Sequence, residues 1–340
     1  MTEPTALLTI IVPTFRRSAN LAVLLRALHR EVAPLDGRVA VLVSDNASPD
    51  DTPAVTAAAQ AAWPALAVQR HATNLGPDEN FCSAVDRVES RWFWIIGDDD
   101  LPRPGTVARL LDLLQAESPA LVHLASHWMD DVTQDRGEIA GPLHVQMLDA
   151  AAFARRVHVW TTFISGIVVD RTRLAAGLGG ESIRRFHGTF LGQLAWVFPV
   201  MTTPGACFAV VSDTCVLATT DNSGQYPLLT VFGARFAQLA HAVFGRGSRV
   251  DRALVDGNLL HYMPGRVWAE RAAPSGRYQH EEPWPALRRE LGDRPLFWLL
   301  LAPLVRWPMW LAQPVYQAWR VFHRIDRALQ ARRARTPVRA

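Results

Sequence analysis

The sequence predicts an α/β fold in which helices flank a mainly parallel sheet. Short apolar strands alternate with helices of about a dozen residues along the first 125 residues, which is typical of βαβ units. Several of these strands end in polar, turn-forming clusters. The chain has 340 residues, of which 49% are hydrophobic and 20% charged, so it can bury a sizeable core.

The elements of the first part follow from hydrophobic spacing. Residues 20–30 carry leucines at the i, i+3, i+4 and i+7 spacing of an amphipathic helix. The Pro77 that precedes another helix suits a first helical position. The expected strands are 8–12, 39–43, 65–69, 92–96 and 120–125, and the expected helices are 20–30, 50–62, 78–88 and 106–117.

The pattern is less regular beyond residue 125. We expect a strand at 163–169 and a helix at 186–197. Residues 207–219 indicate two short strands around Ser212-Asp213, and residues 229–262 carry apolar residues at helical spacing.

Charge and cysteine content exclude several classes of protein. The 35 basic residues, all of them Arg, exceed the 32 acidic ones by only 3, so we expect no nucleic-acid partner. The cysteines Cys82, Cys207 and Cys215 form no CxxC pair, which excludes a zinc ribbon or a disulfide scaffold. The first residues lack the features of a secretory signal. We therefore expect a reducing, cytoplasmic environment.

Three consecutive carboxylates, Asp98, Asp99 and Asp100, follow the apolar strand expected at 92–96. Uncompensated charges repel one another, and a hard cation such as Mg²⁺ or Mn²⁺ relieves that repulsion. The alternative is a solvated turn that caps the helix after Pro104. Ligands of open α/β sheets bind beyond the carboxyl ends of the strands, which is where these aspartates and two other polar clusters lie.

Four motifs, taken together, resemble family 2 glycosyltransferases of GT-A fold. They are Ile10-Ile11-Val12-Pro13-Thr14-Phe15-Arg16-Arg17, Val43-Ser44-Asp45-Asn46-Ala47-Ser48, Asn74-Leu75-Gly76-Pro77 and Gly97-Asp98-Asp99-Asp100. The last two are similar to those of abequosyltransferase-like enzymes of O-antigen assembly. The resemblance implies a Rossmann-like GT-A domain over residues 1–225, with a nucleotide-binding half at 7–125 and an acceptor half at 126–225.

The resemblance also implies a nucleotide site. Pro13, Thr14 and Phe15 would form the loop against the nucleotide, and Asp45 would accept a hydrogen bond from a pyrimidine N–H. Asp45 can instead be the first residue of an Asx turn. Asn74 and Gly76 would shape the wall of the nucleotide pocket. Alternatively, they form only a turn into the next helix.

The metal implied by the resemblance is Mn²⁺ or Mg²⁺. Asp98 or Asp99 would face the ribose, and Asp99 or Asp100 the metal. The register stays open, because Gly97 stands where many relatives have their first aspartate.

No family motif marks the catalytic base. A Glu-Asp pair usually supplies it, and Arg184-Arg185-Phe186-His187-Gly188 stands at the matching place. We expect His187 to be the base because an imidazole titrates near neutrality. Glu181 and Asp213 are alternatives, and a purely structural His187 is another. Arg184 and Arg185 would contact the diphosphate or lie on a solvated face.

The C-terminal part differs in character. Two uncharged runs, 295–305 and 307–319, are too short to span a bilayer. Tryptophan favours the membrane–water interface, and arginine attracts anionic lipid. The tryptophans are Trp284, Trp298, Trp307, Trp310 and Trp319, and the arginines that follow are Arg320, Arg324, Arg327, Arg332, Arg333, Arg335 and Arg339. We expect a helical extension at 226–290 and an amphipathic, basic tail at 291–340 that docks on the membrane; the alternative is a helix packed on the domain.

These features predict a bacterial, metal-dependent glycosyltransferase, inverting by resemblance. It would transfer a sugar from a nucleoside diphosphate-sugar to a lipid-linked saccharide in the synthesis of cell-envelope polysaccharide. We expect it in the cytoplasm, peripherally attached to the inner face of the plasma membrane. The alternatives are an inactive nucleotide-binding membrane scaffold and a sugar-phosphate nucleotidyltransferase. The latter needs a glycine-rich loop after the first strand, and residues 13–17 contain no glycine.

Overall fold

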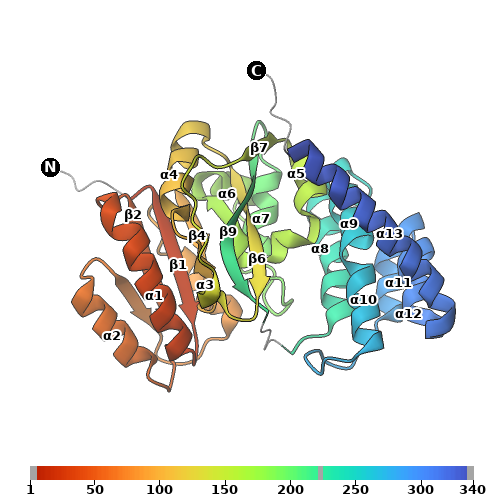
Figure 1. Cartoon of the computed structure of the whole chain (residues 1–340), viewed down its shortest axis with the longest axis horizontal. Coiled ribbons are helices and arrows are strands. Elements are labelled where there is room, and N and C mark those ends of the chain that lie inside the picture. The colour runs from red at the N-terminus through yellow and green to blue at the C-terminus, as the bar shows by residue number, and fades with distance from the viewer. Residues whose placement is uncertain (1–5, 221–224, 335–340) are drawn as a thin grey trace. The chain divides into compact units, whose positions relative to one another are not determined.

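The computed structural model describes residues 6–220 and 225–334, with side chains as far as residue 326. The chain divides into two compact units (Figure 1). Unit 1 consists of Met1–Phe153 and Trp160–Asp221, and unit 2 of Ala154–Val159 and Asn222–Ala340. Helix α5 (Ala150–Val157) therefore begins in unit 1 and ends in unit 2.

Unit 1 is built on one mixed sheet, which has nine strands in the described residues. The strands follow the order β3-β2-β1-β4-β8-β6-β9-β5, and β7 pairs with β9. Their bounds are β1 (Leu8–Thr14), β2 (Val39–Asp45), β3 (Ala67–Arg70), β4 (Trp92–Ile95), β5 (Leu101–Pro102), β6 (Leu121–Met129), β7 (Val145–Leu148), β8 (Ile167–Asp170) and β9 (Phe208–Thr219).

The expectation of a mainly parallel sheet is only partly correct. Strands β1 to β4 pair in parallel, and so do β6 and β9. Strand β8 lies between β4 and β6 and is antiparallel to both, while β5 and β7 are antiparallel to β9. An apolar run records burial on both faces of a sheet but not strand direction, so the sequence could not reveal this reversal.

Helices cover the sheet of unit 1. The four leucines expected on one face of α1 are all buried, because this face packs on the core. The described helices of unit 1 are α1 (Ser18–Val32), α2 (Thr52–Ala62), α3 (Pro77–Val85), α4 (Thr106–Glu117), α6 (Arg171–Leu178) and α7 (Leu194–Met201), with 3₁₀ turns η1 (Ala33–Leu35), η2 (Val132–Gln134) and η4 (Ile164–Gly166). The 3₁₀ turn η3 (His158–Thr162) begins in unit 2 and ends in unit 1.

Three expected elements of the second half are wrong in detail. The helix expected at 186–197 begins only at Leu194, since Gly188 and Phe190 have the positive φ angles of a turn. The strand expected from residue 163 begins at Ile167, after η4. Strand β9 is continuous through Ser212-Asp213, because an irregularity in its pairing with β6 accommodates these residues.

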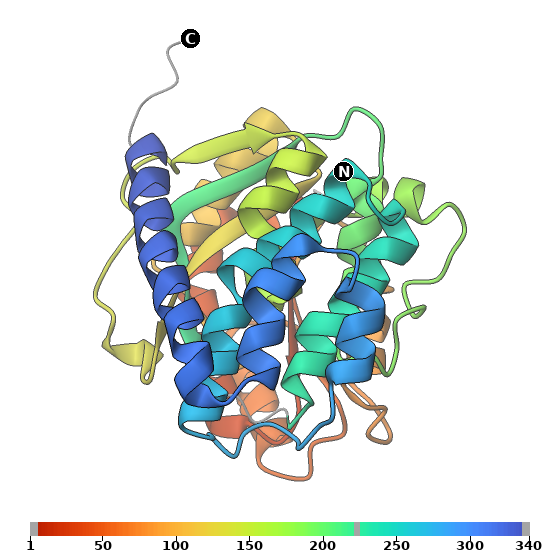
Figure 2. The same ribbon diagram turned by 90° about the vertical axis from the view of Figure 1, so that its right-hand side faces the viewer.

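Unit 2 is helical, and its helices are best seen in the view of Figure 2. Its elements are the π-helical turn η5 (Thr230–Arg235), α8 (Phe236–Phe244), α9 (Arg249–His261), α10 (Met263–Ala272), α11 (Trp284–Leu291), the π-helical turn η6 (Phe297–Leu301), α12 (Ala302–Arg306) and α13 (Met309–Ala334). Among residues 6–220 and 225–334, no helix combines the length and the apolar character needed to cross a membrane.

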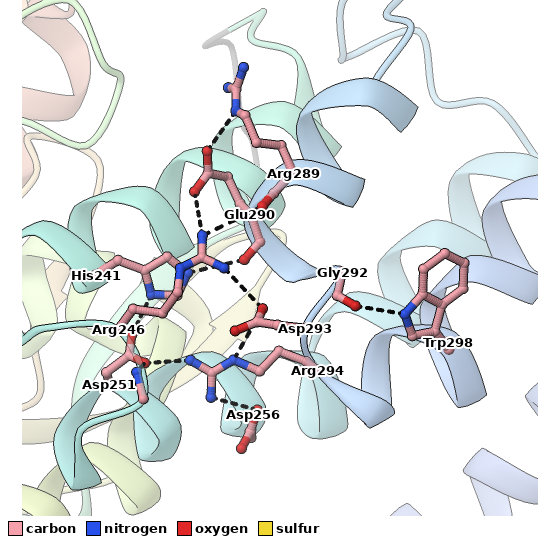
Figure 3. A network of polar contacts seen from close by, with 11 residues as sticks. His241, Arg246, Asp251, Asp256, Arg289, Glu290, Gly292, Asp293, Arg294 and Trp298 are labelled. Carbon is pink, nitrogen blue, oxygen red and sulfur yellow. Dashed lines mark hydrogen bonds and ion pairs between the residues drawn. The ribbon is translucent and has the colours of Figure 1, made fainter.

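A network of charged residues around the buried Asp251 connects α8, α9 and α11 of unit 2 (Figure 3). Asp251 is fully buried and accepts hydrogen bonds from His241 Nδ1 (2.6 Å), from the Gly247 N–H (2.7 Å) and from Arg294. Arg246 Nη2 donates to Glu290 Oε2 at 3.1 Å. A buried charge is tolerated when it is paired and hydrogen-bonded, so this network stabilises the way the three helices pack.

Candidate nucleotide and metal site

The ends of three neighbouring parallel strands bring the predicted nucleotide residues together. Thr14 is the register partner of Asp45, and the strand that precedes Asp98 pairs with β1 on its other side. Thr14 Oγ1 donates a hydrogen bond of 2.7 Å to Asp98 Oδ2. The Asn46 N–H donates to the Thr14 carbonyl at 3.0 Å. The strand ends are therefore joined by direct hydrogen bonds.

Asp45 forms a turn and keeps one carboxylate oxygen without a hydrogen bond. Its side chain is almost fully buried, and Oδ1 accepts from the Ser48 N–H at 2.9 Å. Oδ2 lies 3.4 Å from Arg70 Nε and has no hydrogen-bond donor among the described residues. A buried acceptor of this kind is costly unless a ligand satisfies it. The Asx turn and a ligand-binding role are thus compatible, each through its own oxygen.

Asn46 ties the predicted pocket wall to the end of β2. Its Nδ2 donates to Asn74 Oδ1 (2.9 Å) and to the Gly76 carbonyl (3.1 Å), and its Oδ1 accepts from the Leu75 N–H (2.8 Å). Gly76 has a φ of 81°, a conformation that favours glycine. Asn46 was part of the sequence motif, but no role was predicted for it.

The three consecutive aspartates have different surroundings. Asp98 and Asp100 are buried, and burial raises the pKa of Asp98 to about 6 and that of Asp100 to about 7. Asp100 accepts from Ser165 Oγ at 2.5 Å and from the Thr219 N–H at 3.1 Å. Asp99 is more exposed and forms an ion pair with Arg17. Asp100 is therefore held on both oxygens by the protein, whereas Asp99 is partly exposed and paired with Arg17 alone among the described ion pairs.

Arg17 is the positive charge beside this cluster. Its Nη1 forms the ion pair with Asp99 and lies 3.5 Å from Asp98 Oδ1. Sequence reasoning missed this residue, although an arginine pair directly after the first strand was a visible signal. Arg16 and Ala47, in the loops after β1 and β2, have positive φ angles of 59° and 60°. Backbone strain of this kind gathers at binding sites.

The donor atoms suit a hard divalent cation. Asp98 and Asp99 place two carboxylates against the single charge of Arg17. Mg²⁺ and Mn²⁺ prefer one or two carboxylates together with phosphate oxygens and water. In the part of the chain that the structure describes, no group of three or more His, Cys, Asp and Glu side chains is arranged to hold an ion. Two protein ligands completed by a diphosphate fit this arrangement.

The expected base His187 lies against helix α3. Its Nε2 is 3.3 Å from Cys82 Sγ, and its Nδ1 is 4.0 Å from Glu79 Oε2. Burial raises the pKa of Cys82 to about 12, which leaves the thiol protonated and unreactive. The described contacts of His187 include none of the predicted nucleotide or metal residues.

The alternative bases have structural partners too. Glu181 is exposed and forms an ion pair with Arg185. Asp213 accepts hydrogen bonds from the His144 N–H (2.6 Å) and from His144 Nδ1 (2.9 Å). Arg184 forms two hydrogen bonds of 2.8 Å with Glu79, and its pKa is raised by Glu79 and by Asp86. The structure thus gathers the predicted nucleotide and metal residues, and joins none of the predicted bases to them by a described contact.

Comparisons with known proteins identify this part of the chain. Residues 9–153 match the family model described as "Glycosyl transferase family 2". This stretch of the chain is therefore similar to family 2 glycosyltransferases. The matched residues include Asp45 and all three consecutive aspartates of the site. No curated protein sequence matches the chain.

Solved glycosyltransferase structures share the fold of this chain. TarS 1–349 from S. aureus in complex with UDP is 15% identical with a TM-score of 0.61, and the match covers 94% of this chain and 91% of that one. The mannosyltransferase PcManGT from Pyrobaculum calidifontis, in complex with GDP-Man and Mn²⁺, is 17% identical with a TM-score of 0.54, over 94% and 87% of the two chains. The GT-A-like fold is therefore confirmed.

Proposed function

We propose that this protein is a metal-dependent, inverting glycosyltransferase that transfers a sugar from a nucleoside diphosphate-sugar to a lipid-linked saccharide. We place it at the cytoplasmic face of a bacterial membrane, in the synthesis of envelope polysaccharide. The observation that carries the proposal is the strand-end cluster of Asp45, Asp98 and Asp99, in which two carboxylates adjoin one arginine and Asp45 keeps a buried oxygen free of hydrogen bonds. Similar folds bind UDP, UDP-GlcNAc and GDP-Man.

Each residue of the cluster has a part in donor binding. Asp45 Oδ2 would accept the N–H of a pyrimidine base, since a charged acceptor forms a strong hydrogen bond. The Thr14 hydroxyl positions Asp98 by donating a hydrogen bond to it. Asp98 and the more exposed Asp99 would be the protein ligands of Mn²⁺ or Mg²⁺. When bound, such an ion neutralises charge on the departing nucleoside diphosphate. Asp100 keeps the loop in place through Ser165 and Thr219.

The surface of helix α13 is the observation that supports the proposed attachment to a membrane. One face of the helix is buried through Ala312 and Trp319. A second face carries exposed apolar side chains, at Trp310 (72%), Leu311 (42%), Val321 (58%), Phe322 (43%) and Ile325 (56%). A third face carries arginines, among them Arg320 and Arg324. An apolar stripe beside a basic one is typical of helices that lie in the plane of a membrane interface.

Calorimetry tests the donor site. UDP, CDP, dTDP and GDP are titrated with and without Mn²⁺ into the wild type, Asp99→Asn and, as a matched control, Asp112→Asn, an exposed aspartate of α4. We expect one nucleotide to bind in a Mn²⁺-dependent manner to the wild type and to the control, and at least tenfold more weakly to Asp99→Asn. If no nucleotide binds the wild type with Mn²⁺, the glycosyltransferase proposal is wrong.

Vesicle flotation tests the membrane attachment. Deleting the tail would also remove buried residues such as Phe297 and Trp319, so point substitutions are the better design. A variant with Trp310→Ser, Leu311→Ser and Phe322→Ser is compared with Leu75→Ser, which removes an exposed leucine from unit 1. We expect the wild type and the control to float with vesicles that contain phosphatidylglycerol, and the triple variant to stay in solution. Equal flotation of all three would contradict the docking.

A further inference from the structure

An aromatic cluster lies in unit 1 apart from the residues assigned so far. The ring centroid of Trp128 is 4.8 Å from that of Phe163 and 6.0 Å from that of Trp160. Trp128 follows a largely buried stretch of β6, yet 43% of its surface is exposed. Trp160 and Phe163 are half-buried beneath it, so the three rings form one aromatic surface with Trp128 as its exposed part.

The cluster lies at the same edge of the sheet as the aspartates. Strand β8 is antiparallel to both β4 and β6, so β4 and β6 point in the same direction and their carboxyl ends share an edge. Trp128 is the penultimate residue of β6, and Gly97 and the aspartates follow β4 directly. The sheet therefore presents the indole and the carboxylates on one side of the domain.

Asp100 connects the two features through hydrogen bonds. Ser165 lies two residues after Phe163; its Oγ donates to Asp100 Oδ2 and accepts from the Gly97 N–H at 2.9 Å. Thr219, whose N–H donates to the other oxygen of Asp100, is the register partner of Met129, the residue next to Trp128. The segment that carries Phe163, and the strand β9 that pairs with the strand of Trp128, thus also hold the aspartate loop.

The position of Phe163 is fixed by the absence of a side chain at Gly166. A Cβ atom at Gly166 would lie 2.8 Å from Phe163 Cδ1 and 3.4 Å from the Leu124 carbonyl oxygen. The phenyl ring therefore packs over bare backbone, and Trp128 packs on that ring. Such a surface is already formed before a ligand arrives, which reduces the entropy cost of binding.

We propose that Trp128, Trp160 and Phe163 form a platform for the apolar face of a pyranose ring in the sugar substrate. One face of a pyranose consists mainly of C–H groups, and packing it on an indole buries apolar surface while its hydroxyl groups stay in contact with water. The exposed Asp130, two residues after Trp128, accepts a hydrogen bond from Thr220 Oγ1 through Oδ1 and can accept further ones at the rim through Oδ2. This assignment rests on the proposed glycosyl transfer, because only a sugar substrate brings such a ring next to the aspartates.

Two series of titrations test the platform and distinguish the source of the ring. In the donor series, UDP is compared with UDP-glucose and UDP-GlcNAc, and GDP with GDP-mannose, by calorimetry with Mn²⁺. In the acceptor series, the octyl glycosides of glucose, galactose, mannose and rhamnose are titrated below their critical micelle concentrations, with UDP and Mn²⁺ saturating. The variants are Trp128→Ala, Trp128→Phe and Trp298→Ala, the last removing a similarly exposed indole (46%) from unit 2.

We expect Trp128→Ala to weaken binding at least tenfold in one series while nucleotide affinity stays within twofold of the wild type. The sugar affinity of Trp128→Phe should stay within about threefold of the wild-type value, and Trp298→Ala should bind each sugar as tightly as the wild type. A loss in the donor series assigns the ring to the donor sugar, and a loss in the acceptor series assigns it to the acceptor.

Two results would overturn the platform: Trp128→Ala binds every sugar as tightly as the wild type, or the wild type with nucleotide bound gains nothing from any sugar. Failure of the proposed function is separate from both, because in that case nucleotides do not bind to any variant.

Discussion

The guanidinium of Arg17 pairs with the carboxylate of Asp99 and stands 3.5 Å from Asp98 Oδ1. A positive side chain thus lies beside the two carboxylates that we assign to the metal. Without a metal, this arginine compensates part of their repulsion. When a cation binds there, the arginine and the cation repel each other, so Arg17 lowers the affinity for the metal alone.

Replacing Arg17 should therefore raise the affinity of the protein for the metal by itself. We expect Arg17→Gln to bind Mn²⁺, without nucleotide, about tenfold more tightly than the wild type, equivalent to about 1.4 kcal/mol. Titrations followed by the paramagnetic resonance of free Mn²⁺ measure this directly. Arg16→Gln is the matched control, since Arg16 lies over the Phe15 ring, 5.9 Å from its centroid. Unchanged Mn²⁺ affinity in Arg17→Gln would show that the ion pair does not oppose the metal.

Ser165→Ala should damage the aspartate loop without touching a ligand. The substitution removes the donor to Asp100 and the acceptor of the Gly97 N–H, and leaving such buried groups unpaired costs about 1–3 kcal/mol. Since the Ser165 hydroxyl lowers the pKa of Asp100, which burial raises to about 7, its loss should also leave Asp100 protonated at neutral pH. Urea unfolding measures the free energy of unfolding. The control is Ser275→Ala, at an exposed serine, whose free energy of unfolding should lie within about 0.5 kcal/mol of the wild-type value. A Ser165→Ala protein as stable as this control would contradict the prediction.

Helices α6 and α7 approach each other closely at Gly177. A Cβ there would collide with the backbone carbonyl of Pro199, which cannot move as a flexible side chain would. We expect Gly177→Ala to lower the free energy of unfolding by about 1–3 kcal/mol. Gly141→Ala is the control, because no atom lies within 4 Å of the Cβ position at Gly141. The prediction fails if the two variants melt at the same temperature.

The stability of unit 2 should decrease at alkaline pH because of His241. Its two ring nitrogens face two acceptors, the carboxylate of Asp251 and the carbonyl of Glu290, so both must carry a proton. Burial acts to lower the pKa of His241, but these hydrogen bonds outweigh it and raise the pKa above 6.5. The stabilisation is then complete below pH 6.5 and is lost as the pH rises through the raised pKa.

Hydrogen exchange of the α9 amides between pH 6 and 9 measures this loss, after correction for the intrinsic rate. We expect protection to fall with pH in the wild type and to be lower and independent of pH in His241→Gln. The pKa of Asp251 is lowered, so its contribution persists down to pH 3.8 and does not affect this range. A wild-type protection factor that stays constant to pH 9 would mean that His241 is neutral.

Sequence reasoning predicted the elements of residues 7–125 better than those of the rest of the chain, for a physical reason. The leucines of α1 and the polar strand ends obey local spacing rules, and parallel pairing then gathers those ends at one edge. The direction of β8 and the partners of Asp100 depend on residues far along the chain, Ser165 and Thr219, which no local pattern reveals. His187 was expected from its chemistry alone, and its contacts with Cys82 and Glu79 could not be read from sequence.

Unit 2 contains a segment from the middle of the chain, residues Ala154–Val159, together with everything that follows Asp221. The ring of His158, in that segment, stacks on the ring of His261 with 5.4 Å between the ring centroids. The missing side chain at Gly257 leaves space for the side chain of His158. A gene fragment that starts at residue 222 would encode the helices without this insert, so it would produce an incomplete fold. On the ribosome, the 154–159 segment is made about a hundred residues before the helices it packs against, and it must wait for them. The two units are therefore interleaved in synthesis, and recombination between homologous genes at residue 221 would separate parts that belong together.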